Sequence, residues 1–167
     1  GTREDLALLY GELGEIERGV ALADQARQVA EEQLPILVYW AQAAQVLLHL
    51  QQGNLDGATE LMATLTDYRD VKARFGYLPF MWVRGGLAQG EFARAMGEYG
   101  EAVALMDELY RDVASADIWY LRPDLLWLKG QALVNLGSDH TAEGEKMLAQ
   151  ARTTAETLGL RRVPTQH

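Results

Sequence analysis

The sequence predicts an all-α protein, a right-handed superhelix of about four antiparallel helix pairs. Ala, Leu, Glu and Gln dominate the chain, and these residues favour helices. Alternating runs of Val, Ile and Thr, which are typical of strands, are missing. Glycines recur at a nearly constant spacing, which indicates a repeated structural unit. We expect the 167 residues to form a single domain.

Four glycines, each placed to end a helix, mark the repeat. They are Gly14, Gly53, Gly97 and Gly137, with separations of 39, 44 and 40 residues. Five positions later the first three units carry a small residue, namely Gly19, Ala58 and Ala102. In the fourth unit we expect a longer turn over Ser138–Thr141, followed by Gly144. Small residues at these positions let paired helices approach closely.

In order along the chain, each helix pair is expected to place a more apolar helix before a more polar one. The expected pairs are 2–13 with 15–32, 35–52 with 55–68, 79–96 with 100–114, and 121–136 with 141–159. Pro35, Pro79 and Pro123 suit the first turns of their helices, where a backbone N–H has no partner in the helix. Asp70–Tyr77 is expected to be an inter-repeat loop, either ordered or flexible, and Asp117–Arg122 is either a short separate turn or a kinked helix extension.

The pattern of small and apolar residues resembles the tetratricopeptide repeat. The fourth unit supplies Leu126, Gly130, Leu133, Gly137, Gly144 and Ala151, and the third supplies Gly90, Gly97 and Ala102. The resemblance covers nearly the whole chain, although these units are longer than the usual repeat of about 34 residues. Val46 also stands where the second unit should have a small residue.

Elongated units of this kind are similar to the repeat region of bacterial signal-transduction ATPases, which includes MalT-like transcription activators and adenylate-cyclase-linked regulators. The phrases Arg84–Gly90 and Ala151–Leu160 carry this similarity. It implies a regulatory part of a larger protein, acting in signal transduction or transcription regulation. It also implies a binding partner. That partner is a protein or peptide, another domain of the parent protein, or a small-molecule effector such as an oligosaccharide.

Composition argues against several other classes of function. A formal net charge of −9 disfavours a nucleic-acid-binding surface, and the apolar run Leu34–Leu50 is too short and polar for a membrane span. The absence of Cys excludes disulfides and thiolate metal sites, and it fits a reducing cytoplasm. His49, His140 and His167 lie in different regions without metal-ligand spacing.

Catalytic and cofactor sites are not expected either. Gly85 and Gly86 follow no strand, and no Gly-Lys-Ser/Thr sequence accompanies them, so we expect no nucleotide cofactor. The acidic pairs lie on helix faces expected to be wet, where nothing would shift a pKa for general acid–base chemistry. The sequence therefore predicts a binding protein and not an enzyme.

In tetratricopeptide repeats the first helix of each pair lines a concave groove. We align the helix pairs of this chain with that repeat through the glycines that end the first helices. The alignment places eight residues on the groove: Trp40, Gln51, Arg84, Glu91, Arg94, Trp127, Gln131 and Asn135. Alternatively, Trp40 and Trp127 simply pack between repeat units. Tryptophan beside charged and amide groups would suit a peptide, a helix or an oligosaccharide.

Overall fold

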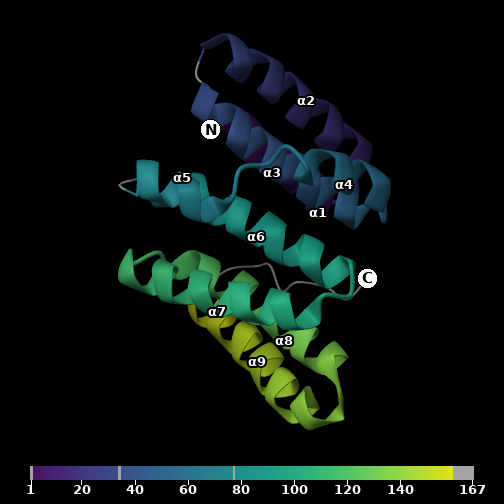
Figure 1. Cartoon of the computed structure of the whole chain (residues 1–167), viewed down its shortest axis with the longest axis vertical. Helices are drawn as coiled ribbons and strands as arrows, with labels where there is room; N and C mark the ends of the chain where they lie inside the picture. The colour runs from purple at the N-terminus through teal and green to yellow at the C-terminus, as the bar shows by residue number, and fades with distance from the viewer. Residues whose placement is uncertain (1, 34, 77, 160–167) are drawn as a thin grey trace. The chain divides into compact units, whose positions relative to one another are not determined.

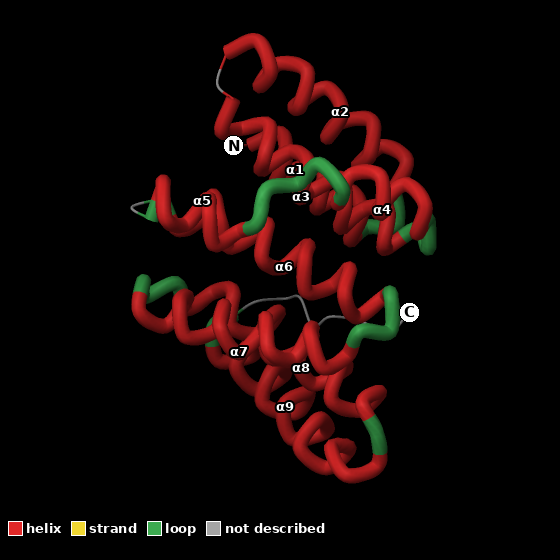
Figure 2. Tube along the Cα trace, in the orientation of Figure 1, coloured by secondary structure: helices red, strands yellow, loops and turns green. Residues whose placement is uncertain are grey.

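The computed structural model describes residues 2–33, 35–76 and 78–159 (Figure 1). Over these ranges the chain consists of helices joined by loops, without a strand (Figure 2). The prediction of an all-α protein is confirmed for this part of the chain. Leu160, His167 and Tyr77, which the sequence analysis named, lie outside the described residues. The chain divides into two compact units, Gly1–Ala95 and Met96–His167.

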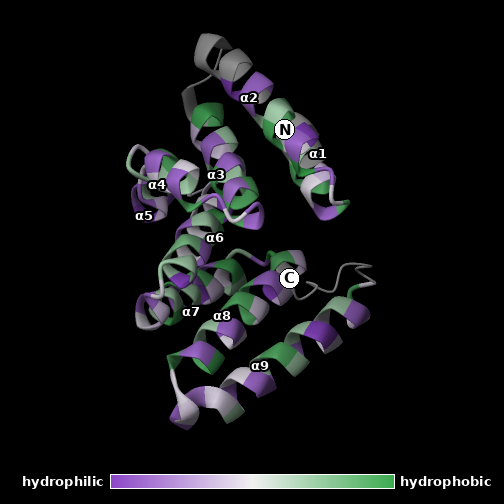
Figure 3. Ribbon diagram, turned by 90° about the vertical axis from the view of Figure 1, so that its right-hand side faces the viewer, coloured by the Kyte–Doolittle hydropathy of each residue, from purple (hydrophilic) through white to green (hydrophobic). Residues whose placement is uncertain are grey.

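Unit 1 contains six helices in its described residues: α1 (Thr2–Glu12), α2 (Ile16–Gln33), α3 (Pro35–Gln51), α4 (Leu55–Met62), α5 (Tyr68–Phe75) and α6 (Pro79–Ala95). Helix α1 packs against α2, while α3 lies between α2 on one side and α4 on the other (Figure 3). Helix α6 packs against α3 and α5. Helix α3 therefore forms the centre of the unit.

The sequence of α3 explains this central position. Its residues Ala41, Ala43, Ala44, Val46 and Leu48 are all fully buried. Their small or apolar side chains cover more than one face of the helix, so that helices can pack on several sides. Leu48 forms a cluster with Ala7 of α1 and Ala23 of α2.

Unit 2 contains α7 (Tyr99–Ser115), a short 3-10 turn η1 (Trp119–Leu121), α8 (Arg122–Leu136) and α9 (Ser138–Thr157). Helix α8 packs against α7 and α9. Pro123 lies in the first turn of α8, as predicted. Leu126 and Trp127 of α8 pack against Ala151 of α9 and form a hydrophobic cluster between the two helices.

The prediction that four glycines end the first helices is confirmed by the backbone. Gly14, Gly53, Gly97 and Gly137 have φ values of 79°, 71°, 81° and 143°. Residues with a Cβ rarely adopt such angles, which is why glycine occupies these turns. The pairs α1–α2, α3–α4 and α8–α9 pack as predicted. The predicted pairing of α6 with α7 falls across the two units and stays a prediction.

The structure corrects the prediction for the segment between the second and third pairs. The second helix of pair two ends at Met62 instead of residue 68, and the expected loop contains helix α5. Asp67 caps α5, because its side chain accepts a hydrogen bond of 2.8 Å from the Arg69 N–H. Tyr68 and Val71, one turn apart, are buried. This inserted helix accounts for the longer separation of 44 residues between Gly53 and Gly97.

The expected turn over Ser138–Thr141 is wrong, since α9 begins at Ser138, directly after Gly137. Gly137, with its φ of 143°, is the only residue between α8 and α9, and Asp139 lies in the first turn of α9, where a negative charge favours the helix. For Asp117–Arg122, the structure supports the separate turn. Asp117 has a φ of 59°, and η1 follows it before α8 begins.

Candidate functional site

The first cluster of predicted site residues lies on α3 and α6 of unit 1. The Trp40 ring centroid is 5.8 Å from that of Phe80, with the ring planes tilted by 58°. The guanidinium carbon of Arg84 lies 5.5 Å from the Trp40 centroid, within the range of a cation–π contact. Trp40 is only 6% exposed, whereas Phe80 is 43% exposed. Phe80 and Arg84 thus cover a buried indole.

These residues belong to a stripe along α6 that is less buried than the rest of the helix. The stripe recurs at spacings of four and three residues, which keeps it on one side of a helix. We call it the α6 stripe, and it consists of Phe80, Arg84, Leu87, Glu91 and Arg94. Most of the residues between them are buried, including Trp82 and Val83. Helix α6 therefore anchors deeply in unit 1 and presents a mixed aromatic and charged stripe.

A close approach to α3 holds α6 in place. The hydroxyl of Tyr39 lies against Gly85, where a Cβ would overlap it. Burial raises the pKa of Tyr39, and the nearby Asp67 and Tyr68 raise it further. The Tyr39 side chain therefore remains neutral at ordinary pH and acts as a packing element between the two helices.

Glu91 and Arg94 form an ion pair within the α6 stripe. Arg94 donates to the carboxylate through Nε over 3.0 Å and through Nη2 over 2.5 Å. The two side chains are 24% and 28% exposed. This bidentate geometry fixes both groups, and their partial exposure leaves them within reach of a partner.

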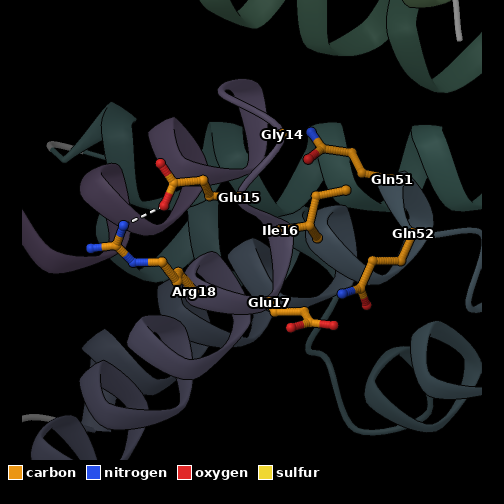
Figure 4. Close-up of a pocket in the computed structure, with 7 residues that line it drawn as sticks. All are labelled: Gly14, Glu15, Ile16, Glu17, Arg18, Gln51 and Gln52. Atoms are coloured by element: carbon orange, nitrogen blue, oxygen red, sulfur yellow. Dashed lines mark hydrogen bonds and ion pairs between the residues drawn. The ribbon is translucent and has the colours of Figure 1, made fainter.

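Gln51 lies apart from this cluster, at the end of α3. It lies eleven positions after Trp40, a distance of about 16 Å along the helix axis. It borders an open hollow at the α1–α2 turn, together with Gly14, Glu17 and Gln52 (Figure 4). An ion pair between Arg18 and Glu15 lies at the edge of the hollow, and this hydrogen bond raises the pKa of Arg18.

The remaining three predicted residues lie on α8 of unit 2. Trp127 is 8% exposed, and the guanidinium carbon of Arg152 on α9 lies 5.6 Å from its ring centroid. Asn135 is exposed and donates a hydrogen bond of 2.8 Å to the Gln131 carbonyl. Both predicted tryptophans are therefore buried within their units. Packing between repeat units, which the alternative interpretation expects, stays a prediction.

The structure thus brings the predicted residues together in three groups. Trp40 contacts Arg84, Glu91 pairs with Arg94, and Gln131 bonds to Asn135. The predicted strip from Arg94 to Trp127 would join the two units and stays a prediction. Sequence reasoning missed Phe80, although it lies four residues before Arg84 and so on the same stripe.

Metal binding and membrane insertion are two further possible roles of the helices. Among the described residues, no three His, Cys, Asp or Glu side chains come together in a way that could hold a metal ion. No helix in residues 2–33, 35–76 and 78–159 combines the length and apolar character that a membrane span needs. Comparison of the chain with protein-family models, with curated proteins and with solved structures finds no match.

Proposed function

We propose that this chain is a non-catalytic repeat module of the tetratricopeptide type that binds a protein or peptide partner. It would act in the cytoplasm, within a bacterial signalling or transcription regulator. The observation that carries the proposal is the α6 stripe, because a deeply anchored helix there presents an aromatic side chain and fixed charges side by side. Rigid helices position binding groups more accurately than loops do.

Two features of the backbone support the repeat part of this proposal. Four glycines with positive φ, at three similar spacings, end the first helices of the pairs, and the α8–α9 pair crosses at Gly130 and Gly144. Units stacked as in tetratricopeptide repeats would build a continuous right-handed superhelix with an extended binding surface. That superhelix, and the binding groove within it, are part of the proposal.

Each group of the α6 stripe has a distinct role in the proposed contact. Phe80, which is 43% exposed, would supply apolar area to the partner. Arg84, held over Trp40, and the Glu91–Arg94 pair would orient the partner by charge. Because these charged side chains are already held in place, little side-chain entropy is lost on binding.

Charge reversal on the α6 stripe tests the proposal. Binding partners would be captured from an extract of the source cells with the wild-type chain, then purified and titrated against variants. We expect Arg94→Glu to weaken binding by about tenfold or more, since it reverses a fixed interface charge. The double variant Glu91→Arg, Arg94→Glu restores the ion pair in reversed order, so its melting temperature should return to the wild-type value while binding stays weak.

Two results would count against this function. Full binding by the double variant would show that the charges of the α6 stripe do not contact the partner. In that case weak binding by Arg94→Glu alone would reflect lost stability, so Arg94 would act only on the fold. A capture experiment that enriches the same proteins on wild-type and double-variant chains would lead to the same conclusion.

The second candidate is a small-ligand sensor, for which an oligosaccharide is the expected ligand class. The hollow bordered by Gln51, Gln52 and Glu17 favours it, because amide and carboxylate groups suit hydroxyl-rich ligands. Its openness to solvent favours a protein partner instead, since small-molecule sites usually enclose most of the ligand surface. A thermal-shift screen with sugars and nucleotides distinguishes the two, because a bound ligand raises the melting temperature by mass action.

A further inference from the structure

Basic residues gather on two neighbouring helices of an otherwise acidic unit. Residues 67–95, which run from the cap of α5 to the end of α6, hold five basic and three acidic side chains. The rest of unit 1 holds three basic and ten acidic side chains. The segment of α5 and α6 therefore has a net charge of +2, against −7 for the remainder of the unit. Such a change of sign indicates a region that attracts negative charge.

The fold holds these five cations in place. In four of them the charged group lies 5.1 to 5.6 Å from the centroid of an aromatic ring, within the range of a cation–π contact. The four pairs are Arg69 over Tyr68, Lys72 over Trp82, Arg74 over Phe75 and Arg84 over Trp40. The fifth cation, Arg94, pairs with Glu91. A ring fixes a cation without removing its charge.

The cations of α5 and of α6 lie on different sides of α6. Lys72 of α5 lies over Trp82 of α6. Residues two apart on a helix are separated by about 160° around its axis, so Trp82 faces away from Phe80 and Arg84 of the α6 stripe. A partner on the α6 stripe would therefore contact Arg84. The cations of α5 would act on it through their field, which extends about 8 Å at physiological ionic strength.

On the α6 stripe, Arg84 lies between two apolar side chains. Phe80 precedes it by four residues and is 43% exposed, and Leu87 follows it by three residues and is partly exposed. Phe80 and Leu87 are seven positions apart, which is about 10 Å along the helix axis. A partner helix with apolar residues at positions i and i+7 has the same spacing. An acidic residue at its position i+3 or i+4 would meet Arg84.

We propose that the partner bound by the α6 stripe is an acidic amphipathic helix, an inference that rests on the proposed function. Its apolar side chains pack on Phe80 and Leu87, and a carboxylate between them binds the Arg84 guanidinium. Its remaining negative charge is attracted by the cations of α5. A nucleic acid is a poorer match, because the acidic remainder of unit 1 repels its continuous phosphate charge.

Selection from a random library of displayed peptides on the immobilised chain tests the class of partner. We expect the enriched peptides to carry two apolar residues seven positions apart, with Asp or Glu three or four positions after the first. Enriched peptides that are basic or uncharged between the apolar positions would overturn the acidic class and leave the proposed function intact. The absence of any enriched peptide would count against both. Tighter binding of a labelled single-stranded DNA than of the best peptide, at the same ionic strength, would favour a nucleic acid instead.

The binding rates of an enriched acidic peptide separate direct contact from attraction at a distance. Arg84→Gln removes a contact, so we expect it to raise the dissociation rate by about tenfold or more. Arg74→Gln is the matched control, because it removes the same charge from α5. It should lower the association rate about twofold, with a larger effect at low ionic strength, and leave the dissociation rate unchanged.

Helical content is measured for each variant. An unchanged dissociation rate in a folded Arg84→Gln chain would overturn the proposal. Where that variant does not fold, the wild-type chain decides, because its affinity for the acidic peptide must fall as ionic strength rises. Binding that does not depend on ionic strength would overturn the proposal as well.

Discussion

Glycines allow helices to approach closely in both units, but the group that packs against the glycine differs between the two units. In unit 2 the approach is between backbones: a Cβ at Gly130 would lie 2.9 Å from the Gly144 carbonyl oxygen, and one at Gly144 would lie 2.8 Å from the Gly130 oxygen. In unit 1 the contact between α3 and α6 is between a side chain and a backbone. There Gly85 admits the Tyr39 ring and hydroxyl, which reach across from α3.

The two contacts differ in how easily the neighbouring atoms can move to make room for an added methyl group. At Gly130 the other close atoms belong to Leu148, whose flexible side chain can rotate away. At Gly85 the neighbour is a rigid aromatic side chain that is itself buried, and interiors packed to crystal density leave it no space to move. A methyl group should therefore be tolerated less well at Gly85 than at Gly130, although both positions lie within helices.

The largest expected effect is that of Gly85→Ala. The added methyl group overlaps the Tyr39 hydroxyl, so the variant should lose about 3 kcal/mol of unfolding free energy, at the upper end of the range for overpacking. Denaturant titration measures it. In a double-mutant cycle with Tyr39→Ala, the two effects should be strongly non-additive, because removing the ring relieves the overlap. Simple additivity would mean that Tyr39 does not occupy the space beside Gly85.

Gly130→Ala should be destabilising by a smaller amount, about 1–2 kcal/mol. Overpacking against Gly144 and Leu148 is partly offset by the better helix propensity of alanine. Gly100→Ala is the matched control in the same unit, because nothing lies within 4 Å of its added Cβ. That variant should gain about 0.5–1 kcal/mol from helix propensity. If the two alanines had the same effect, the α8–α9 crossing would be looser than the structure indicates.

The second helices of the pairs α3–α4 and α8–α9 also begin differently. Asn54 caps α4 of unit 1, since its Oδ1 accepts a hydrogen bond of 3.0 Å from the Gly57 N–H, while its Nδ2 lies 3.0 Å from His49 Nδ1. Helix α9 of unit 2 follows Gly137 and has no side-chain cap. Asn54→Ala should therefore cost about 1 kcal/mol. Ser138→Ala, at the start of α9, should change stability by only a few tenths, and a larger loss there would reveal a cap that the structure lacks.

The parts of the fold that sequence predicted are those that depend on local chemistry. A helix needs helix-forming residues, and a tight turn after it needs a positive φ, so Gly14, Gly53 and Gly97 could be recognised as helix ends. Helix α5 was missed because its signal is weak. It is only two turns long, and it is held by Asp67 and by Gln89 of α6, which accepts from the Tyr68 N–H at 3.3 Å. Such tertiary support cannot be deduced from the segment alone.

The site was harder to predict than the fold. The spacing of Arg84, Glu91 and Arg94 was enough to place them on one helix side. Whether a tryptophan is buried depends on its neighbours in space. The cation over Trp40 comes from α6 and the one over Trp127 from α9, 44 and 25 residues away along the chain. Sequence periodicity does not carry that information.

A small effect at neutral pH is expected for Tyr39→Phe, and its pH dependence distinguishes the Tyr39–Gly85 contact from the Gly130–Gly144 contact. The Tyr39 hydroxyl is buried and has no hydrogen-bond partner among the described residues, so its removal should change stability at pH 7 by less than about 1 kcal/mol, in the stabilising direction. Burial raises the pKa of Tyr39 in the folded chain above its ordinary value of about 10. The unfolded chain then ionises first as pH rises.

The contribution of neutral Tyr39 to stability is therefore complete below about pH 10 and is lost as the pH rises further. Denaturant titrations of wild type and Tyr39→Phe between pH 7 and pH 11 should give parallel values up to about pH 9.5 and diverge above it, with the wild type falling faster. Comparison with the phenylalanine variant subtracts the titration of every other group. Gly130→Ala should show no such divergence, because the atoms nearest its added Cβ are the Gly144 carbonyl oxygen and the apolar side-chain atoms of Leu148. Curves that stay parallel to pH 11 would mean that Tyr39 is accessible to solvent, and the contrast between the two units would then reduce to the size of the residues alone.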